Sequence, residues 1–259
     1  AYMVRNIGDI TAQVNPKNGN LTVGGGDLSI TGGLAGCSNI CVAPTYNSKD
    51  GIPLGPFGKG WRSVLTEMAN YSPDTNSLTY FNTSGSTFRF NPVYDENNNF
   101  NGGFYSPPTF DWNANIDFSA EPNKRIKLIS KTGDMTYYFN GYDGYLREVT
   151  TAQGGEIIFN RNPEKPELIN SIEDSYSGRK LQFTYDPYDR IIAVEDPLER
   201  MVNYEYNEQN QLIAITDVLN RRISYEYDEL NRMKNIKLNG ELSLSMDYQV
   251  MGDPLAISS

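Results

Sequence analysis

The sequence predicts an all-β protein built from antiparallel hairpins, and three observations carry this prediction. A segment in the second half of the chain recurs every 21 residues, apolar and polar side chains alternate within each copy, and Asp- and Asn-rich turns separate the alternating stretches. Alternation with a period of two, rich in aromatic and β-branched residues, is typical of half-buried strands. One hairpin cannot bury its apolar face alone, so successive hairpins are expected to join in one large curled sheet.

The clear repeats cover residues 178–240, and each copy predicts a strand, a polar turn and a second strand. In the first copy these are residues 181–185, 186–189 and 190–194. The recurring side chains are Arg179, Arg200 and Arg221; Tyr185, Tyr206 and Tyr227; Asp186, Asn207 and Asp228; Arg190, Gln211 and Arg232; and the inner tyrosines Tyr204 and Tyr225. Asp and Asn at these positions are explained by turn chemistry, because their side chains hydrogen-bond the backbone two residues on.

The rest of the chain is less regular. Phe139 and Phe159 mark a degenerate earlier copy, and residues 161–177 are interpreted as an insertion between repeats. We expect a Gly-rich β segment at 1–64, irregular strands at 65–135 and repeat hairpins at 136–259. The only short helix expected lies within residues 63–70.

Composition excludes several classes of function. The chain has 259 residues, no histidine, and a net charge of −10 from 22 basic and 32 acidic residues. Nucleic acid is not an expected partner, since a phosphate backbone is repelled by that charge. Without histidine there is no Ser-His-Asp or Cys-His arrangement and no His-ligated metal. A glycosidase with two convergent carboxylates is a third class of function, but we predict a non-catalytic chain with no cofactor. No apolar run is long enough for a membrane-spanning helix.

Two smaller patterns allow alternative interpretations. Cys37 and Cys41 are consistent either with a small disulfide loop or with two reduced, buried thiols. Asp95, Asn97 and Asn99 alternate like calcium ligands, but Phe100 and Ser106 stand where a calcium loop needs glycine and glutamate, so a solvated surface loop is favoured.

Two sets of residues resemble the Rhs or YD-repeat family. The stretch Tyr225-Glu226-Tyr227-Asp228-Glu229-Leu230-Asn231-Arg232 resembles its repeat, and the second copy departs from that pattern at Asn207 and Gln211. The segments Tyr46-Asn47-Ser48 and Phe57-Gly58-Lys59-Gly60-Trp61 resemble the segment that precedes the first repeats in that family. Together the two matches cover most of the chain, and residues 65–135 are the least diagnostic part.

This resemblance implies a spiralling β-sheet that forms part of a hollow shell, with Trp61 as a plug residue. The expected function is structural. The chain would be a piece of a secreted or surface protein of bacterial origin, whose partners are further repeats and a C-terminal toxin or effector of the same chain. The alternative is an adhesion module that binds carbohydrate, such as cell-wall glycan, or a partner surface through its 18 tyrosines and two tryptophans. An exposed cluster of tyrosines on one sheet face would favour adhesion, and a packed ladder would favour the shell.

Overall fold

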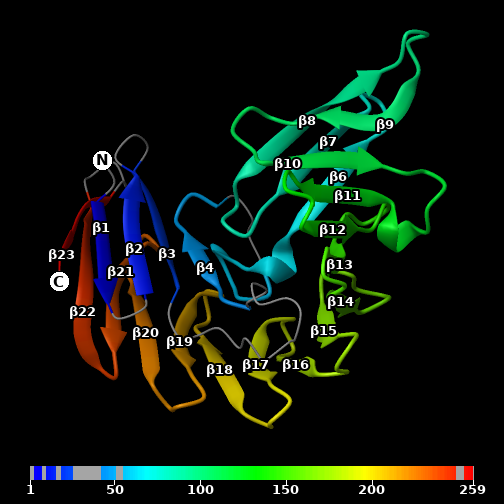
Figure 1. Ribbon diagram of the computed structural model, residues 1–259. Coiled ribbons are helices and arrows are strands. Elements are labelled where there is room, and N and C mark those ends of the chain that lie inside the picture. The colour runs from blue at the N-terminus through cyan, green and yellow to red at the C-terminus, as the bar shows by residue number, and fades with distance from the viewer. Residues whose placement is uncertain are drawn as a thin grey trace. The chain divides into compact units, whose positions relative to one another are not determined.

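A computed structural model describes residues 3–7, 10–15, 19–25, 42–50, 55–248 and 254–258 (Figure 1). Cys37 and Cys41 lie outside these residues. The chain divides into two compact units: unit 1 comprises residues 1–30, 41–63 and 183–259, and unit 2 comprises residues 31–40 and 64–182. Among the described residues, no helix is long and apolar enough to cross a membrane.

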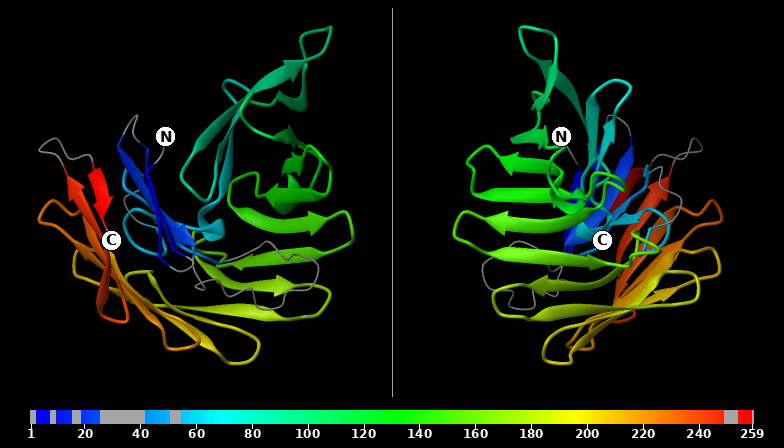
Figure 2. Two further views of the ribbon diagram at one scale, coloured as in Figure 1. Left: turned by 60° about the vertical axis from the view of Figure 1, so that its left-hand side comes forward. Right: turned by 90° about the vertical axis from the view of Figure 1, so that its right-hand side faces the viewer.

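Unit 2 is an antiparallel meander in which each strand pairs with the next in the sequence. Figure 2 shows β11 to β15 as successive rungs. Its strands are β6 (Met68–Ser72), β7 (Ser77–Phe81), β8 (Thr87–Tyr94), β9 (Phe100–Tyr105), β10 (Trp112–Ile116), β11 (Ile126–Ser130), β12 (Met135–Phe139), β13 (Leu146–Thr151), β14 (Glu156–Arg161) and β15 (Ile169–Asp174). Two short 3₁₀ turns, η1 (Val64–Thr66) and η2 (Pro122–Lys124), interrupt it. Its largest fully buried side chains include Phe90, Phe139 and Phe159.

Unit 1 contains the repeat strands and the Gly-rich segment. Strand β16 (Lys180–Tyr185) spans the boundary, and the later strands are β17 (Ile191–Glu195), β18 (Met201–Tyr206), β19 (Leu212–Thr216), β20 (Arg222–Tyr227), β21 (Met233–Leu238), β22 (Glu241–Tyr248) and β23 (Pro254–Ser258). A second sheet is formed by β1 (Met3–Ile7), β2 (Ile10–Asn15), β3 (Asn20–Gly25), β4 (Thr45–Asn47) and β5 (Trp61–Arg62). Its first two strands contact β23.

The 21-residue period is also present in the strand register. The ladder shifts by a β-bulge between Glu205 and Tyr206, again before Tyr227, and a third time before Tyr248. A bulge increases the local twist and re-aims the side chain that follows it. Tyr206, Tyr227 and Tyr248 therefore follow the same kind of bulge, and β22 belongs to a further copy that the sequence pattern did not reveal.

The structure confirms the all-β prediction. The turn η1 lies inside the range expected to hold the only short helix, but η2 lies outside it, so the expectation of a single helical turn was wrong. The structure also corrects the interpretation of residues 161–177 as an insertion. Residues 169–174 of that range form strand β15, which pairs antiparallel with β14 with a register shift between Asn160 and Arg161. Only the connection at 162–168 is longer than the repeat turns. Pro163 and Pro166 fall inside that connection, where no ladder hydrogen bond is lost.

Candidate functional site

Most of the repeat turns are closed by an aspartate and an arginine four residues apart. After β20, Asp228 Oδ1 accepts hydrogen bonds from the backbone N–H groups of Leu230 (3.0 Å) and Arg232 (2.9 Å), and its Oδ2 accepts one from Arg232 Nε (2.7 Å). Asn231 adopts the left-handed conformation, with φ 61°. Burial alone would raise the pKa of Asp228, but the hydrogen bonds from Arg232 and Leu230 outweigh it and lower the pKa. This pair has a structural role, because it satisfies turn backbone.

The same arrangement recurs in other turns of the chain. Further ion pairs across four-residue spacings are Asp143–Arg147, Asp186–Arg190, Asp196–Arg200 and Asp217–Arg221. In the divergent copy, Asn207 Nδ2 donates to Gln211 Oε1 (2.7 Å), and Asn207 Oδ1 accepts the backbone N–H of Gln211 (2.9 Å). A neutral pair thus closes the turn as the charged pairs do. Arg179, the first arginine of the predicted series, is exposed, and its carbonyl accepts the N–H of Asp174.

In three copies the last tyrosine joins two strands through its hydroxyl group. These hydroxyls donate to backbone carbonyls 15 residues earlier: Tyr206 to Ile191 (2.6 Å), Tyr227 to Leu212 (2.8 Å) and Tyr248 to Met233. Tyr248 was missed by the sequence reasoning, although it lies 21 residues after Tyr227. Tyr185 is half-buried at the end of β16.

Arginine covers two of these tyrosine rings, and the third is covered differently. The guanidinium of Arg190 lies 4.7 Å from the ring centre of Tyr206, and that of Arg232 lies 4.3 Å from Tyr248. A cation over an aromatic face is a favourable contact. The residue in the corresponding position before Tyr227 is the neutral Gln211, and the Gly-rich segment contacts Tyr227 instead.

The Gly-rich segment, hereafter the plug segment (its described residues in unit 1, namely 3–7, 10–15, 19–25, 42–50 and 55–63), packs on tyrosines of the repeat strands through Phe57 and Trp61. The ring of Phe57 lies 5.1 Å from that of Tyr204, and the ring of Trp61 lies 4.9 Å from that of Tyr225. Trp61 Nε1 also donates a hydrogen bond to the Tyr227 hydroxyl at 3.2 Å. Phe57, Trp61, Tyr204 and Tyr225 are at most 3% exposed, so this contact is a hydrophobic core.

Backbone contacts fix the position of the plug segment on the repeats. The N–H of Lys59 donates to the carbonyl of Asn210 (2.9 Å), and the N–H of Ile191 donates to the carbonyl of Pro56 (2.8 Å). Gly58 has φ 81°, and a Cβ there would lie 2.5 Å from the Asn210 oxygen. Only glycine permits both this conformation and this approach.

The Tyr46-Asn47-Ser48 motif joins the plug strands to one another. The backbone N–H of Asn47 donates to the carbonyl of Gly60 (2.8 Å), and the Ser48 hydroxyl accepts the N–H of Leu21 (2.9 Å). The ring of Tyr46 lies over Gly60, where a Cβ would come within 3.0 Å of it. These residues therefore have structural roles within the plug segment.

Sequence reasoning missed one buried ion pair in the plug segment. Arg62 donates from Nε and from Nη2 to the carboxylate of Asp50, the latter at 2.9 Å, and the two side chains are only 4% and 3% exposed. Their separation of 12 residues matches no local pattern, so the sequence carries no signal for it. Loss of either partner would leave a buried, uncompensated charge.

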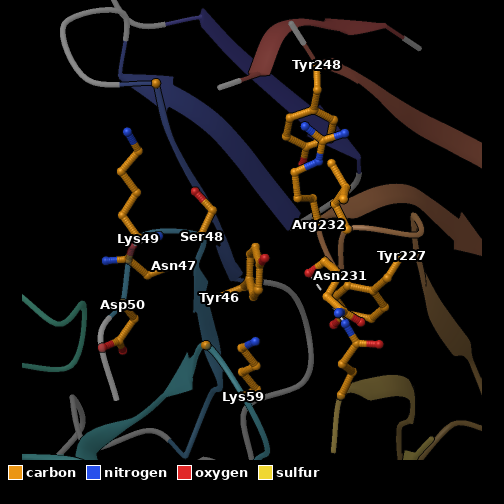
Figure 3. A pocket seen from close by; sticks show the side chains of 14 residues that line it. Tyr46, Asn47, Ser48, Lys49, Asp50, Lys59, Tyr227, Asn231, Arg232 and Tyr248 are labelled. Carbon is orange, nitrogen blue, oxygen red and sulfur yellow. Dashed lines mark hydrogen bonds between the residues drawn. The ribbon is translucent and has the colours of Figure 1, made fainter. Parts of the chain in front are cut away.

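A small cavity of about 200 Å³ lies where the plug segment meets the repeats (Figure 3). It is lined by Gly19, Tyr46, Asn47, Ser48, Lys49, Asp50, Lys59, Gly60, Gln211, Tyr227, Leu230, Asn231, Arg232 and Tyr248. Burial raises the pKa of Tyr46 to about 12, so its hydroxyl stays protonated at neutral pH. Asp50 is paired with Arg62 and Arg232 with Asp228. The cavity offers hydrogen bonds, but no placed pair of groups for acid–base chemistry.

The calcium-like residues form a turn. Asp95 Oδ1 accepts the backbone N–H groups of Asn97 (2.9 Å) and Asn99 (2.8 Å), and Asn98 has φ 61°. These hydrogen bonds lower the pKa of the exposed Asp95 carboxyl. Within the described residues, no group of three or more Cys, Asp or Glu side chains is arranged to hold a metal ion.

Comparison with known proteins identifies the repeat. Residues 206–238 match the family model of the RHS repeat. No curated protein sequence matches the chain. Among solved structures, it is similar to TcdB2-TccC3-TEV, with 12% identity over 95% of this chain and a TM-score of 0.37. It is also similar to TcdB2-TccC3 without its hypervariable C-terminal region, with 10% identity over 96% of this chain and a TM-score of 0.40.

The chain spans only 12% and 18% of the lengths of those two structures. The matched range begins at Tyr206 and includes the turn closed by Asp228 and Arg232. The 21-residue hairpins and their Tyr-Asp-Arg turns thus include an RHS repeat at residues 206–238, and this repeat is what the chain shares with the family model.

Proposed function

We propose that this chain forms part of the β-wall of a larger Rhs/YD-repeat protein, secreted by or displayed on a bacterium, and that the wall encloses or presents a C-terminal effector. The chain itself is a structural repeat segment. The observation that carries the proposal is the packing of Phe57 and Trp61 on Tyr204 and Tyr225. The inner tyrosines are packed in a core, as a closed wall requires. A surface that binds ligands through tyrosine would leave these rings exposed.

Two further observations support a containing role over a catalytic one. The whole sequence has no histidine, and the recurring aspartates are engaged by arginine and by turn backbone. The recurring turns are also built alike along the repeat strands, as a wall of similar units requires. An activity, where one exists, would then belong to another part of the larger protein.

The proposal is tested on the native protein that contains this segment. Its intact mass should be several times 29.1 kDa, with further repeats downstream. An epitope tag at its C-terminus should resist proteinase K in the intact protein and become cleavable after unfolding. A native product near the mass of this chain, or a tag that is cut at once, would contradict the proposal.

A matched variant sharpens this test. Replacing Phe57 and Trp61 together by alanine should make the tag more accessible, because these rings attach the plug segment to the repeats. Replacing the exposed Tyr176, which is 88% exposed at a turn, should leave protection unchanged. Adhesion is the second candidate function, and an exposed aromatic cluster in unit 2 favours it.

A further inference from the structure

Unit 2 carries an aromatic cluster that the repeat pattern does not include. The rings of Tyr71 and Phe100 are stacked with centres 6.1 Å apart, and Phe118 meets them edge-on at 5.5 Å and 6.3 Å. Phe118 is nevertheless 54% exposed. An exposed ring held by two neighbours is a rigid platform, which loses little conformational freedom when a ligand stacks on it.

Beside this platform lies an open hollow of about 640 Å³. Its floor is formed by two adjacent glycines of β9. Gly102 has φ 88°, and a Cβ there would lie 2.2 Å from the carbonyl oxygen of Ile116, so only glycine fits. Gly103 differs, because its backbone is not left-handed; a Cβ there would lie 3.1 Å from the Asn101 side-chain oxygen, which would have to shift slightly, and 3.9 Å from Val93. Gly103 lines the hollow without a side chain, so we expect a larger residue there to reduce the space.

Polar side chains surround the floor. The strand register pairs Asn115 with Gly103 on one side and with Lys127 on the other, so all three positions share one sheet face. Asn101, Asp117 and Ser119 are further polar lining residues. Lys127 and Asp117 interact favourably, which helps to lower the pKa of Asp117 after the hydrogen bonds from Ser119. The hollow thus combines amide groups with a balanced pair of charges.

We propose that this hollow is a binding site for a neutral oligosaccharide. A sugar ring offers an apolar face that stacks on Phe118 and hydroxyl groups that hydrogen-bond to Asn101, Asn115 and Asp117. Ligand sites typically combine an aromatic wall with a few placed polar groups. The balanced local charge and the net charge of −10 favour a neutral ligand over an anionic one.

This site lies wholly within unit 2 and deepens the adhesion alternative, without depending on the wall role. The wall proposal and the sugar-binding proposal can therefore be refuted independently. Absence of sugar binding would leave the mass and protease results of the larger protein unaffected, and an exposed C-terminal tag would leave sugar titrations of this chain unaffected.

The experiment titrates the full chain with chitotetraose, maltotetraose and cellotetraose, followed by calorimetry and by amide chemical shifts. We expect at least one of them to bind with a millimolar or tighter dissociation constant and to shift the amide signals of residues 101–103 and 115–118. Phe118→Ala, which removes the stacking ring, and Gly103→Val, which fills the hollow, should each weaken binding at least tenfold. Tyr176→Ala, which removes an exposed tyrosine from a turn outside the hollow, should bind as the unchanged chain does.

Gly103→Val is the sharper variant, because valine suits a strand and Gly103 needs no left-handed conformation. Its melting temperature and amide spectrum away from β9 establish that the fold is intact, and Phe118→Ala gives the same test without adding volume. The proposal is overturned if none of the three sugars binds, or if binding survives both substitutions.

Discussion

Glu67 is a buried acid whose burial has a measurable consequence. Its carboxylate accepts a hydrogen bond from the Tyr80 hydroxyl at 3.0 Å in the interior of unit 2. Burial raises the pKa of Glu67 from 4.5 to about 8, against the opposing hydrogen bonds from Tyr80 and the backbone of Thr83. The folded protein therefore holds a proton that the unfolded chain has released between these two values.

We predict that Glu67→Gln removes part of the pH dependence of stability. Because the folded pKa is raised, the free energy of unfolding of the unchanged chain should fall as pH rises from about 4.5 to about 8. Each pKa unit corresponds to about 1.4 kcal/mol, so the loss amounts to a few kcal/mol. Glutamine accepts the same Tyr80 hydrogen bond without titrating. Urea unfolding at pH 5, 7 and 9 checks this, and parallel pH profiles for the two proteins would refute it.

The Tyr227 hydroxyl gives a second prediction at the residue scale. It donates to the carbonyl of Leu212 at 2.8 Å and accepts from Trp61 Nε1 at 3.2 Å. Tyr227→Phe keeps the ring but leaves the indole N–H and the carbonyl unsatisfied, so unfolding should become easier by about 1–3 kcal/mol. Denaturant titration measures the change. The control is Tyr188→Phe, at a position 76% exposed, which should alter stability little.

At the scale of the element, the turn is the repeated unit. Asp228→Ala removes the acceptor of two backbone N–H groups and of Arg232, and should cost about 1–3 kcal/mol. The natural pair of Asn207 and Gln211 closes the same turn without charge. The double variant Asp228→Asn with Arg232→Gln should therefore lose less than half as much stability as Asp228→Ala. Equal losses in thermal unfolding would mean that the ion pair, rather than the turn geometry, holds the hairpin.

Hairpins were predictable from sequence because their determinants are local. Alternation, Asx turns and a fixed period all act within 21 residues, and they located the strands between 178 and 240. The copy ending at Tyr248 was missed because its turn residues diverge, although its bulge and hydroxyl contact repeat. Strand β15 was missed because Pro163 and Pro166, which are typical of loops, lie just before it in the sequence.

The candidate sites were less predictable, because their contacts join distant parts of the chain. Trp61 meets Tyr227 across 166 residues, and no local spacing encodes that contact. The aromatic cluster around Phe118 draws on β6 and β9 and the chain after β10, none of which repeats. Motif resemblance pointed to Trp61 as a plug residue, but only the structure identifies the tyrosines on which it packs.

At the scale of the whole molecule, the central claim is that the plug segment and the repeat strands of unit 1 form one cohesive structure. Tertiary burial supplies most of the stability of such hairpins, which cannot bury their apolar faces alone. Removing the rings of Phe57 and Trp61 should therefore loosen strands that lie far from them in the sequence.

Amide hydrogen exchange tests this claim most directly. The strands at 201–238 are compared between the unchanged chain and the variant with Phe57→Ala and Trp61→Ala, with Tyr176→Ala as the control. We expect exchange at 201–238 to become at least tenfold faster in the double variant and to stay unchanged in the control. Unchanged protection of 201–238 in the double variant would show that the repeat strands are stable without the packing of the plug segment. It would contradict the claim that the two form one cohesive structure.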